Sequence, residues 1–353
     1  MSSLEREFEI AGRSVGSESR CFVIAEAGVN HNGDLARALE LVDVAAAANA
    51  DAVKFQTFDA DRLATHDAPK AQYQVDTTGA SQSQREMLRG LQLSIEDHRA
   101  LIARCAQRDI IFLSTPFDEE SADLLASLDV PAFKTPSGEL TNLPYLAHVA
   151  RLGKPVIAST GMASLAEVEA AVAAIVAGGC RELALLHCVS NYPAAAEDVN
   201  LRAIETLAQT FGVPAGYSDH TDGIAIALAA AARGAAIVEK HFTLDRSLPG
   251  PDHRASLEPA ELERMVREIR AIESALGDGR KEPAASERDT AAVARKSLVT
   301  VCDIAPGERL TEAKVAAKRP GTGLAPALRD RVIGRSARVA IAAGTLLEWE
   351  MLN

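Results

Sequence analysis

Short apolar runs recur along the first 240 residues of the chain, and stretches with the apolar spacing of helices separate most of them. Strands that are apolar throughout, rather than alternating, are typical of a parallel sheet covered by helices. Eight such runs follow one another: 21–26, 51–56, 110–114, 132–135, 155–159, 183–188, 213–217 and 235–240. Eight strand–helix units over roughly 250 residues predict an α/β fold of the (β/α)8 TIM-barrel type. An open doubly wound sheet is the alternative.

The predicted helices carry start signals. Helical spacing is clear at 35–48, 165–177 and 224–232. Asp34 and Ser94 stand where N-caps are expected, with Asp97 three residues after Ser94. Ser164 and Glu167 form a capping-box pattern. These signals favour helices, rather than loops, between the apolar runs.

The longest connection of the predicted barrel is 57–109. It holds a polar stretch at 76–85 that contains glycine, serine and glutamine. Because long connections in compact domains are often functional, this stretch predicts a surface loop over the site.

The chain changes character after the last barrel helix, which is predicted to begin near Pro259 and to stop at Gly277. A charged, proline-containing stretch follows, and β-like runs then alternate with turns at 297–301, 305–308 and 337–341. The chain is therefore divided into a barrel, 1–280, a linker, 281–293, and a small β-rich domain, 294–353. Such a small domain is marginal alone and is expected to pack on other protein surface.

Composition narrows the possible partners. With 37 lysines and arginines against 49 aspartates and glutamates, the net charge is −12, which argues against a nucleic-acid partner. No apolar run approaches the ~18 residues of a membrane span, and no basic-then-apolar segment opens the chain, so a cytoplasmic protein without membrane contact is expected. The five cysteines are scattered without CxxC spacing, which predicts reduced, buried thiols.

Polar residues stand at or just after the end of every predicted strand, where the active site of a barrel is built. They are Glu26, Asn30, His31, Lys54, Gln56, Ser114, Thr115, Lys134, Ser137, Glu139, Ser159, Thr160, His187, Ser190, Tyr192, Ser218, Asp219, His220, Lys240 and His241. Their common register predicts that they gather at one rim of the barrel.

Two histidines end neighbouring strands of the predicted barrel. His220 follows the seventh strand and His241 the eighth, so their imidazoles are expected to meet at the same rim. Two nitrogen ligands leave positions for water and a substrate oxygen, which suits Mn²⁺, Mg²⁺ or a similar ion acting as a Lewis acid. The alternative is a pair of unrelated core histidines.

Two lysines, Lys54 and Lys134, interrupt apolar strands, where an ammonium group is costly to bury unless it is paired. A phosphate or carboxylate substrate would compensate them, and Ser137 and Ser159 would add donors for the same anion. A Schiff base on Lys134 is a second possibility. A third is an internal salt bridge to one of three carboxylates: Glu26, Glu139 or Glu239.

Nine motifs of the chain resemble those of the sialic acid synthase family. They are IAEAGVNHNG at 24–33, VKFQ at 53–56, STPFD at 114–118, KTPSGE at 134–139, STGM at 159–162, YSDH at 217–220, EKHFT at 239–243, GPDH at 250–253 and KRPGTG at 318–323. The resemblance implies a TIM barrel followed by an antifreeze-like SAF domain of β-clip type. It also implies a homodimer in which that domain covers the partner's active site.

The resemblance assigns a role to each candidate residue. His220 and His241 would hold the divalent metal, with Mn²⁺ favoured and Mg²⁺ or Co²⁺ as alternatives, and Glu26 would orient water or move protons beside it. The residues expected to bind phosphoenolpyruvate are Lys54, Thr115, Lys134, Ser137, Ser159 and Ser218. Those expected to contact the sugar are Gln56, Glu139, Ser190, Tyr192, Asp252 and, from the second subunit, Arg319.

The implied reaction condenses phosphoenolpyruvate with an N-acylated mannosamine-type sugar and water, giving a nine-carbon 2-keto sugar acid and phosphate. Ser190 stands where many bacterial members carry Asn, and the sequence after Glu139 looks closer to members that make legionaminic-type sugars. The sugar could therefore be N-acetylmannosamine, its 6-phosphate or 2,4-diacetamido-2,4,6-trideoxymannose. Two other functions remain as alternatives: a carbohydrate- or ice-binding tail on a barrel scaffold, and a different phosphoenolpyruvate–aldose condensation.

Overall fold

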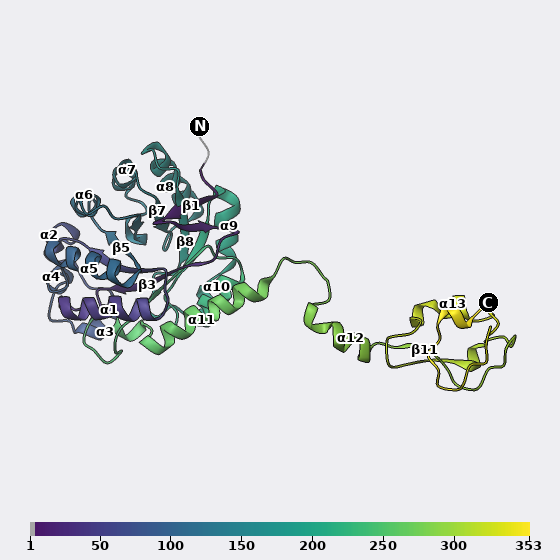
Figure 1. Cartoon of the computed structure of the whole chain (residues 1–353). Coiled ribbons are helices and arrows are strands. Elements are labelled where there is room, and N and C mark those ends of the chain that lie inside the picture. Colours follow the sequence, from purple (N-terminus) through teal and green to yellow (C-terminus); the bar gives the residue numbers. More distant parts are fainter. Residues whose placement is uncertain (1–3) are drawn as a thin grey trace. The chain divides into compact units, whose positions relative to one another are not determined.

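The chain forms two compact units, which Figure 1 shows for the computed structural model. The structure describes residues 4–353. The first unit ends at Gly277 and the second begins at Asp278. The predicted last barrel helix is confirmed, because α11 spans Pro259–Leu276 and Gly277 follows it with a φ of 61°, a conformation that glycine adopts without strain.

Eight parallel strands form the main sheet of the first unit and confirm the predicted barrel. They are β3 (Phe22–Gly28), β4 (Ala52–Thr57), β5 (Ile111–Pro116), β6 (Phe133–Thr135), β7 (Val156–Ser159), β8 (Leu183–Cys188), β9 (Ala215–Asp219) and β10 (Ile237–His241). The ladder runs β5-β4-β3-β10-β9-β8-β7-β6, and its two end strands lie next to each other. Because β3 pairs with β10, the sheet curls into a nearly closed barrel, and the doubly wound alternative is wrong.

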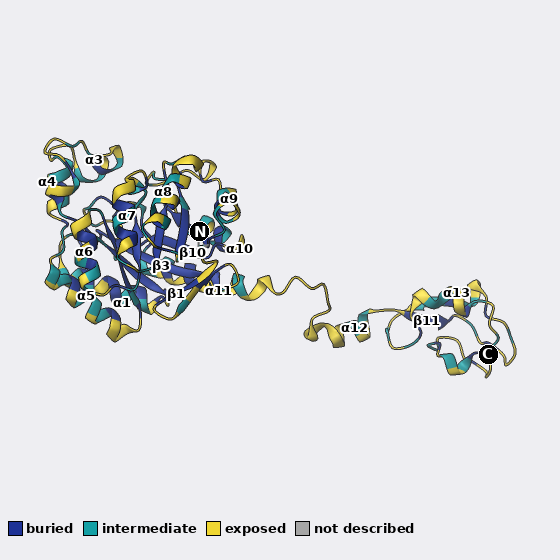
Figure 2. Cartoon of the chain, turned by 90° about the horizontal axis from the view of Figure 1, so that it is seen from above, coloured by how far each residue is buried: buried dark blue, intermediate teal, exposed yellow. Residues whose placement is uncertain are grey.

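Helices follow the strands, and Figure 2 shows the buried strands surrounded by helices with exposed outer faces. They are α1 (Leu35–Ala47), α5 (Ile95–Arg108), α6 (Glu119–Ser127), α7 (Leu143–Arg151), α8 (Leu165–Ala177), α9 (Arg202–Phe211) and α10 (Ala225–Ala232), before α11. The three predicted starts are confirmed: the side chains of Asp34, Ser94 and Ser164 accept backbone N–H bonds in the first turn of α1, α5 and α8. No helix among residues 4–353 is long and apolar enough to cross a membrane.

The N-terminal end of the barrel is filled with apolar side chains. The hairpin β1 (Glu7–Ile10) and β2 (Arg13–Gly16) contributes Phe8, Ile10 and Val15 to a buried cluster. That cluster continues into the strands through Phe22, Ile24, Ala52, Leu113, Ile157, Ala184, Leu186 and Ile237. The polar residues of the strands therefore lie towards the opposite, C-terminal end.

The connection between β4 and α5 is more ordered than predicted. It contains α2 (Ala60–Leu63), α3 (Gln72–Thr78) and α4 (Gln84–Arg89), so the expected loop at 76–85 is helical except at 79–83. A capping box explains the start of α4, since Ser83 and Glu86 bond each other's backbone N–H groups. The ring of Tyr73 in α3 stacks on Tyr192 at 5.0 Å, which brings this segment over the C-terminal end of the barrel.

The second unit has a small core of its own, built by residues that include Leu298, Ile304, Leu310 and Leu347. Its elements are α12 (Arg288–Ala294), β11 (Ser297–Thr300), the antiparallel β12 (Val315–Lys318) and α13 (Arg329–Val332). The predicted β-like run at 305–308 is wrong: it is a turn, with Gly307 at a φ of 81°. The run at 337–341 forms only isolated bridges, and β12 was missed.

Candidate active site

A cavity of about 420 Å³ lies at the C-terminal ends of the barrel strands and collects nearly all the predicted site residues. Its lining includes Glu26, Lys54, Gln56, Thr115, Lys134, Ser137, Glu139, Ser159, Ser190, Tyr192, Ser218, His220, His241 and Asp252. Arg319 belongs to the second unit, where its exposed side chain donates a hydrogen bond from Nε to the carbonyl oxygen of Ala294 at 3.0 Å. Fourteen of the fifteen predicted residues thus line one cavity.

Lys54 is held inside the cavity by a carboxylate and a hydroxyl. Its Nζ lies 2.7 Å from Oε2 of Glu26 and donates to Oγ1 of Thr115 at 2.8 Å. A second carboxylate, Glu239, lies 3.6 Å away. Burial alone would lower the pKa of Lys54, but Glu239 and Glu26 outweigh it and raise that pKa, so the side chain stays charged.

Lys134 is less fully compensated. Its Nζ donates to Oγ of Ser159 at 2.7 Å and to the carbonyl oxygen of Thr135, and among residues 4–353 it forms an ion pair only with Glu239, at 3.7 Å. Burial therefore lowers the pKa of Lys134 despite that carboxylate. An anion arriving beside Lys134 would stabilise its charged form, as expected of a binding site for phosphate or carboxylate.

Glu239, considered in the sequence only as a possible salt-bridge partner, is the centre of the charged network. It lies between the two ammonium groups and accepts a hydrogen bond from Oγ of Ser218 at 2.8 Å. Burial would raise its pKa, but Lys134 and Lys54 outweigh burial and hold that pKa at about 2. Burial raises the pKa of Glu26 to about 7, although Lys54 opposes the shift. Two ammonium groups thus face one firmly ionised carboxylate and one that protonates readily.

The two predicted metal ligands meet at the rim, with the ring centroids of His220 and His241 5.5 Å apart. Nδ1 of His220 lies 2.8 Å from the carbonyl oxygen of Val189. Because a carbonyl only accepts, Nδ1 carries the proton and Nε2 keeps its lone pair. Burial lowers the pKa of both imidazoles, to about 4 for His220, so both are neutral.

The donor set fits a divalent metal ion. Nδ1 of His241 is buried without a hydrogen-bond partner and lies 4.0 Å from Oδ2 of Asp252. Neutral imidazoles are good ligands for such ions. Within residues 4–353 no group of three or more His, Cys, Asp or Glu side chains is arranged to hold a metal. The chain would therefore supply two imidazoles and leave the remaining positions to water and substrate.

Several polar residues that end predicted strands lie outside the cavity, and the two-residue alternation of a strand explains why. Lys240 points away from the neighbouring Glu239 and His241, and its Nζ pairs with Oδ2 of Asp219 at 2.8 Å, both side chains fully buried. His187 likewise bonds the carbonyl oxygen of Val199. The others outside the lining are Asn30, His31, Ser114 and Thr160. These seven residues stand at the same end of the strands, as predicted, but their side chains do not line the cavity.

The cavity also contains residues that the sequence did not single out. Cys188 ends β8 on the same face as Ala184 and Leu186, and its Sγ lies 3.0 Å from Oγ of Ser137. Alternation along β8 was the signal that could have found it. Tyr73, Gln74, Gln84 and Met87 come from the β4–α5 connection, for which the sequence predicted only that the stretch 76–85 lies over the site, without singling out a residue.

Comparisons with known proteins agree with this geometry. The NeuB family model matches residues 41–281 and the SAF domain model matches residues 295–353. The N,N'-diacetyllegionaminic acid synthase of Legionella pneumophila is 48% identical over 342 residues, which cover 96% of each chain. The human N-acetylneuraminate-9-phosphate synthase is 38% identical and covers 85% of this chain and 83% of its own.

A solved structure gives the same result. The N-acetylneuraminic acid synthetase of Leptospira borgpetersenii superposes with a TM-score of 0.71 at 36% identity, covering 82% of this chain and 96% of its own. The family match includes seven of the eight barrel strands, and a relative that matches over 96% of the chain is named as a synthase, so the alternative in which the barrel is only a scaffold is wrong. The chain therefore belongs to the NeuB family, and the protein is a synthase of the sialic-acid type with a SAF domain at its C-terminal end.

Proposed function

We propose that the enzyme condenses phosphoenolpyruvate with an N-acylated mannosamine-type sugar and water, releasing phosphate and a nine-carbon 2-keto sugar acid. The observation that carries the proposal is the placement of two buried lysines and two neutral imidazoles in one cavity. The 48% identity with a named legionaminic acid synthase favours N,N'-diacetyllegionaminate over N-acetylneuraminate as the product. The cytoplasm, where phosphoenolpyruvate is made, is the proposed location.

The lysines provide the binding site for phosphoenolpyruvate. Lys54 and Lys134 offer the positive charge, and the hydroxyls of Thr115, Ser159 and Ser218 already bond the charged groups of the network. Ser137 lies beside them and accepts a bond from the backbone N–H of Gly161 at 3.0 Å. These donors suit the carboxylate and phosphate of one small anion.

The imidazoles provide the site for the aldehyde end of the sugar. His220 and His241 would hold a divalent ion, most suitably Mn²⁺, with Mg²⁺ or Co²⁺ as alternatives, whose Lewis acidity would favour attack on the aldehyde carbon. Tyr192 packs against both rings, at 4.2 Å and 5.7 Å between centroids, and fixes their orientation. Gln56, Glu139, Ser190 and Asp252 line the cavity around them and would contact the sugar's hydroxyl and amide groups.

Bond making and breaking then balance without a Schiff base. C3 of phosphoenolpyruvate bonds to the aldehyde carbon, whose oxygen takes up a proton. Water adds at C2, the C2–O bond to phosphate breaks with its electron pair leaving on phosphate, and a carbonyl forms. Glu26 lies between Lys54 and Gln56, with a pKa of about 7 because it is buried, and is suited to orient that water and to hold its proton.

Phosphate release tests the proposed function directly. The full-length protein is incubated with Mn²⁺, phosphoenolpyruvate and each candidate amino sugar, and phosphate and product masses are recorded. We expect phosphate release only when a sugar is present, with a product mass equal to the sugar plus pyruvate. Sugar-independent phosphate release, or none with any sugar, would contradict the proposal.

Replacing Gly28 by alanine is expected to lower kcat/KM by roughly 10–100-fold, since small displacements of reacting groups have effects of this size. Gly28 has a φ of 52°, and an added Cβ would lie 3.3 Å from Oε1 of Glu26 and 3.5 Å from both Gln56 and His241. Gly12→Ala is the matched control, because Gly12 has a φ of 77° but no atom within 4 Å of the added Cβ. Equal loss of activity in both variants would show that backbone strain alone is responsible.

Replacing Arg319 by alanine is expected to raise the KM for the sugar about 10-fold or more, by loss of a charged hydrogen bond, with little change in the KM for phosphoenolpyruvate. The reason is the proposed homodimer, in which the SAF domain of one subunit covers the active site of the other. Arg338→Ala removes another exposed arginine from the same unit and serves as the control. An unchanged sugar KM in Arg319→Ala would mean that Arg319 does not reach the substrate.

A further inference from the structure

One side of the active-site cavity is apolar. We call it the apolar wall. It consists of six apolar residues that line the cavity, in contrast to the charged residues described above: Val29, Leu63, Met87, Leu88, Leu91 and Phe117. Val29 and Leu91 are buried and pack with Phe58, and the side chains of Leu63, Leu88 and Phe117 pack against that cluster. The proposed reaction, which involves an anion, a metal ion and an aldehyde, uses none of these side chains.

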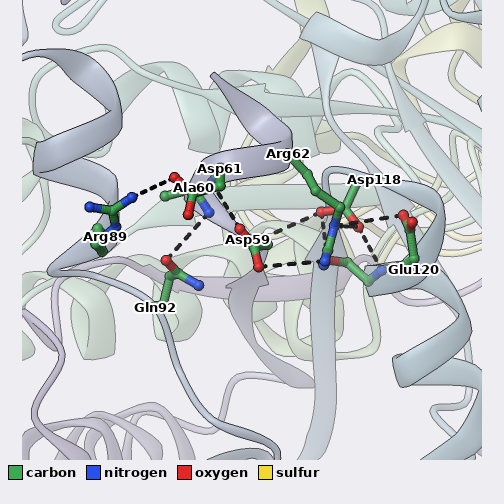
Figure 3. Close-up of polar contacts among 9 residues, drawn as sticks. Asp59, Ala60, Asp61, Arg62, Arg89, Gln92, Asp118 and Glu120 are labelled. Atoms are coloured by element: carbon green, nitrogen blue, oxygen red, sulfur yellow. Dashed lines mark hydrogen bonds and ion pairs between the residues drawn. The ribbon is translucent and has the colours of Figure 1, made fainter. Parts of the chain in front are cut away.

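The wall is held in place from its outer side. Figure 3 shows the polar residues of this region pairing with one another: Arg62 in α2 lies against Asp59, Asp118 and Glu120, and Arg89 in α4 against Asp61. The Nε of Arg62 lies 3.0 Å from Oδ1 of Asp118, which joins α2 to the turn after β5. These pairs tie α2 and α4 to neighbouring segments, and Leu63 of α2 and Met87 and Leu88 of α4 line the cavity.

The wall begins next to the reacting groups. Val29 follows Gly28, and Gly28 is so close to Glu26 and His241 that an added Cβ would lie 3.3–3.5 Å from their side chains. A sugar whose aldehyde end lies at His241 can therefore extend along the wall. The far end of that sugar, from C4 to C6, would then contact the apolar wall.

Two glutamines border the wall: the side-chain oxygen of Gln74 is engaged as an acceptor, and Gln84 is one of its donors. Oε1 of Gln74 accepts from the backbone N–H of Ala71 at 3.1 Å and from Nε2 of Gln84 at 3.5 Å. The Nε2 group of Gln74 carries two N–H bonds, of which one serves the hydroxyl of Tyr73, and the other suits the carbonyl oxygen of an acetamido group. A hydroxyl group on C6 that contacted these apolar side chains would lose its hydrogen bonds to water and gain none from the protein.

We propose that the apolar wall receives the methyl groups at the far end of the sugar, those of the C4 acetamido group and of C6. It would thereby make the enzyme prefer 2,4-diacetamido-2,4,6-trideoxymannose to N-acetylmannosamine. The inference rests on the proposed function and adds the residues that distinguish sugars by their substituents at C4 and C6. Met87 is the residue on which the preference depends most, because it is buried, flexible and lies in the cavity lining.

The test compares Met87→Gln with Met87→Leu in the full-length enzyme. Glutamine matches methionine in length but brings a polar group, whereas leucine keeps the site apolar. Glutamine can also still accept the bond that Oγ1 of Thr78 gives to Sδ of Met87 at 3.7 Å, so α3 and α4 should stay together. The measured quantity is the ratio of kcat/KM for the trideoxy sugar to that for N-acetylmannosamine, with 2-acetamido-2,6-dideoxymannose isolating the C6 methyl group.

We expect Met87→Gln to lower the ratio by about 10-fold or more, the scale on which an apolar pocket discriminates one small group, and Met87→Leu to retain it. An unchanged ratio in Met87→Gln would overturn the inference. Calorimetric binding of the reduced, unreactive sugar alcohols provides a readout that does not need turnover. If the sugar alcohols bind with the same preference while the enzyme releases no phosphate, the proposed reaction is contradicted but the role of the apolar wall is not. If both alcohols bind equally well, the role of the apolar wall is contradicted and the proposed reaction is not.

Discussion

Replacing Lys134 by methionine is expected to raise the KM for phosphoenolpyruvate by roughly 100-fold or more, the size expected for truncating one partner of a desolvated charge pair, while the enzyme stays folded. Lys134 is the ammonium group with the weaker compensation, and burial lowers its pKa. Its removal leaves Glu239 paired with Lys54 at 3.6 Å and bonded by Ser218 at 2.8 Å. The loss therefore falls on the incoming anion and little on the folded chain.

Lys54→Met is expected to behave differently. Lys54 lies 2.7 Å from Glu26, so its removal leaves a buried carboxylate without its close cation and lowers the free energy of unfolding by about 3–5 kcal/mol. Urea unfolding and steady-state kinetics on both variants separate the two effects. Lys154→Met, which breaks a surface pair with Asp129, is the control and should change neither quantity appreciably. An unchanged phosphoenolpyruvate KM in Lys134→Met would show that the anion binds elsewhere.

The barrel was predictable because its strands are buried on both faces. A strand covered by helices outside and by side chains inside can be apolar throughout, and all eight apolar runs overlap observed strands. The helix starts were predictable for a local reason, since Asp34, Ser94 and Ser164 act within one turn of their own helix. Sequence signals from adjacent residues were therefore enough to predict the elements whose structure depends on adjacent residues.

The same apolar runs conceal which residues face the cavity. Lys54, Lys134 and Lys240 all interrupt apolar strands, yet only the first two point inwards, and Lys240 pairs with Asp219 outside the cavity. A strand that alternates apolar and polar residues reveals its inner face, whereas a strand buried on both sides does not. The direction of Lys240 follows instead from its neighbours in the sequence. Side chains alternate along a strand, and Glu239 and His241 both face the cavity, so Lys240 lies on the opposite face.

The apolar wall was beyond prediction for another reason. Its helices α2 and α4 are short, 4 and 6 residues, and too short to be stable on local propensity alone. They are fixed by contacts between distant parts of the chain, such as Arg62 with Asp118. Nothing in the sequence at 58–94 specifies those pairings, and the polar composition of 76–85 pointed to a loop.

Replacing either His220 or His241 by alanine is expected to abolish Mn²⁺ binding by the full-length protein and, with it, the condensation. The chain supplies only two imidazoles, because no third His, Cys, Asp or Glu joins them in a metal-binding group within residues 4–353. Losing one of two protein ligands should reduce metal affinity by more than the roughly 10–100-fold that loss of an outer hydrogen-bond partner produces. EDTA should likewise remove activity, and added Mn²⁺ should restore it in the wild type but in neither variant.

The control for this experiment is His187→Ala. His187 lies on β8, next to the strand that precedes His220, but it bonds the carbonyl oxygen of Val199 outside the cavity. Mn²⁺ binding, followed by electron paramagnetic resonance, should be retained in this variant and lost in the other two. Because the readout is metal bound to protein, it separates loss of the ion from loss of catalysis. Wild-type Mn²⁺ affinity in both His220→Ala and His241→Ala, or full activity of the metal-free enzyme, would show that the imidazoles serve the sugar directly.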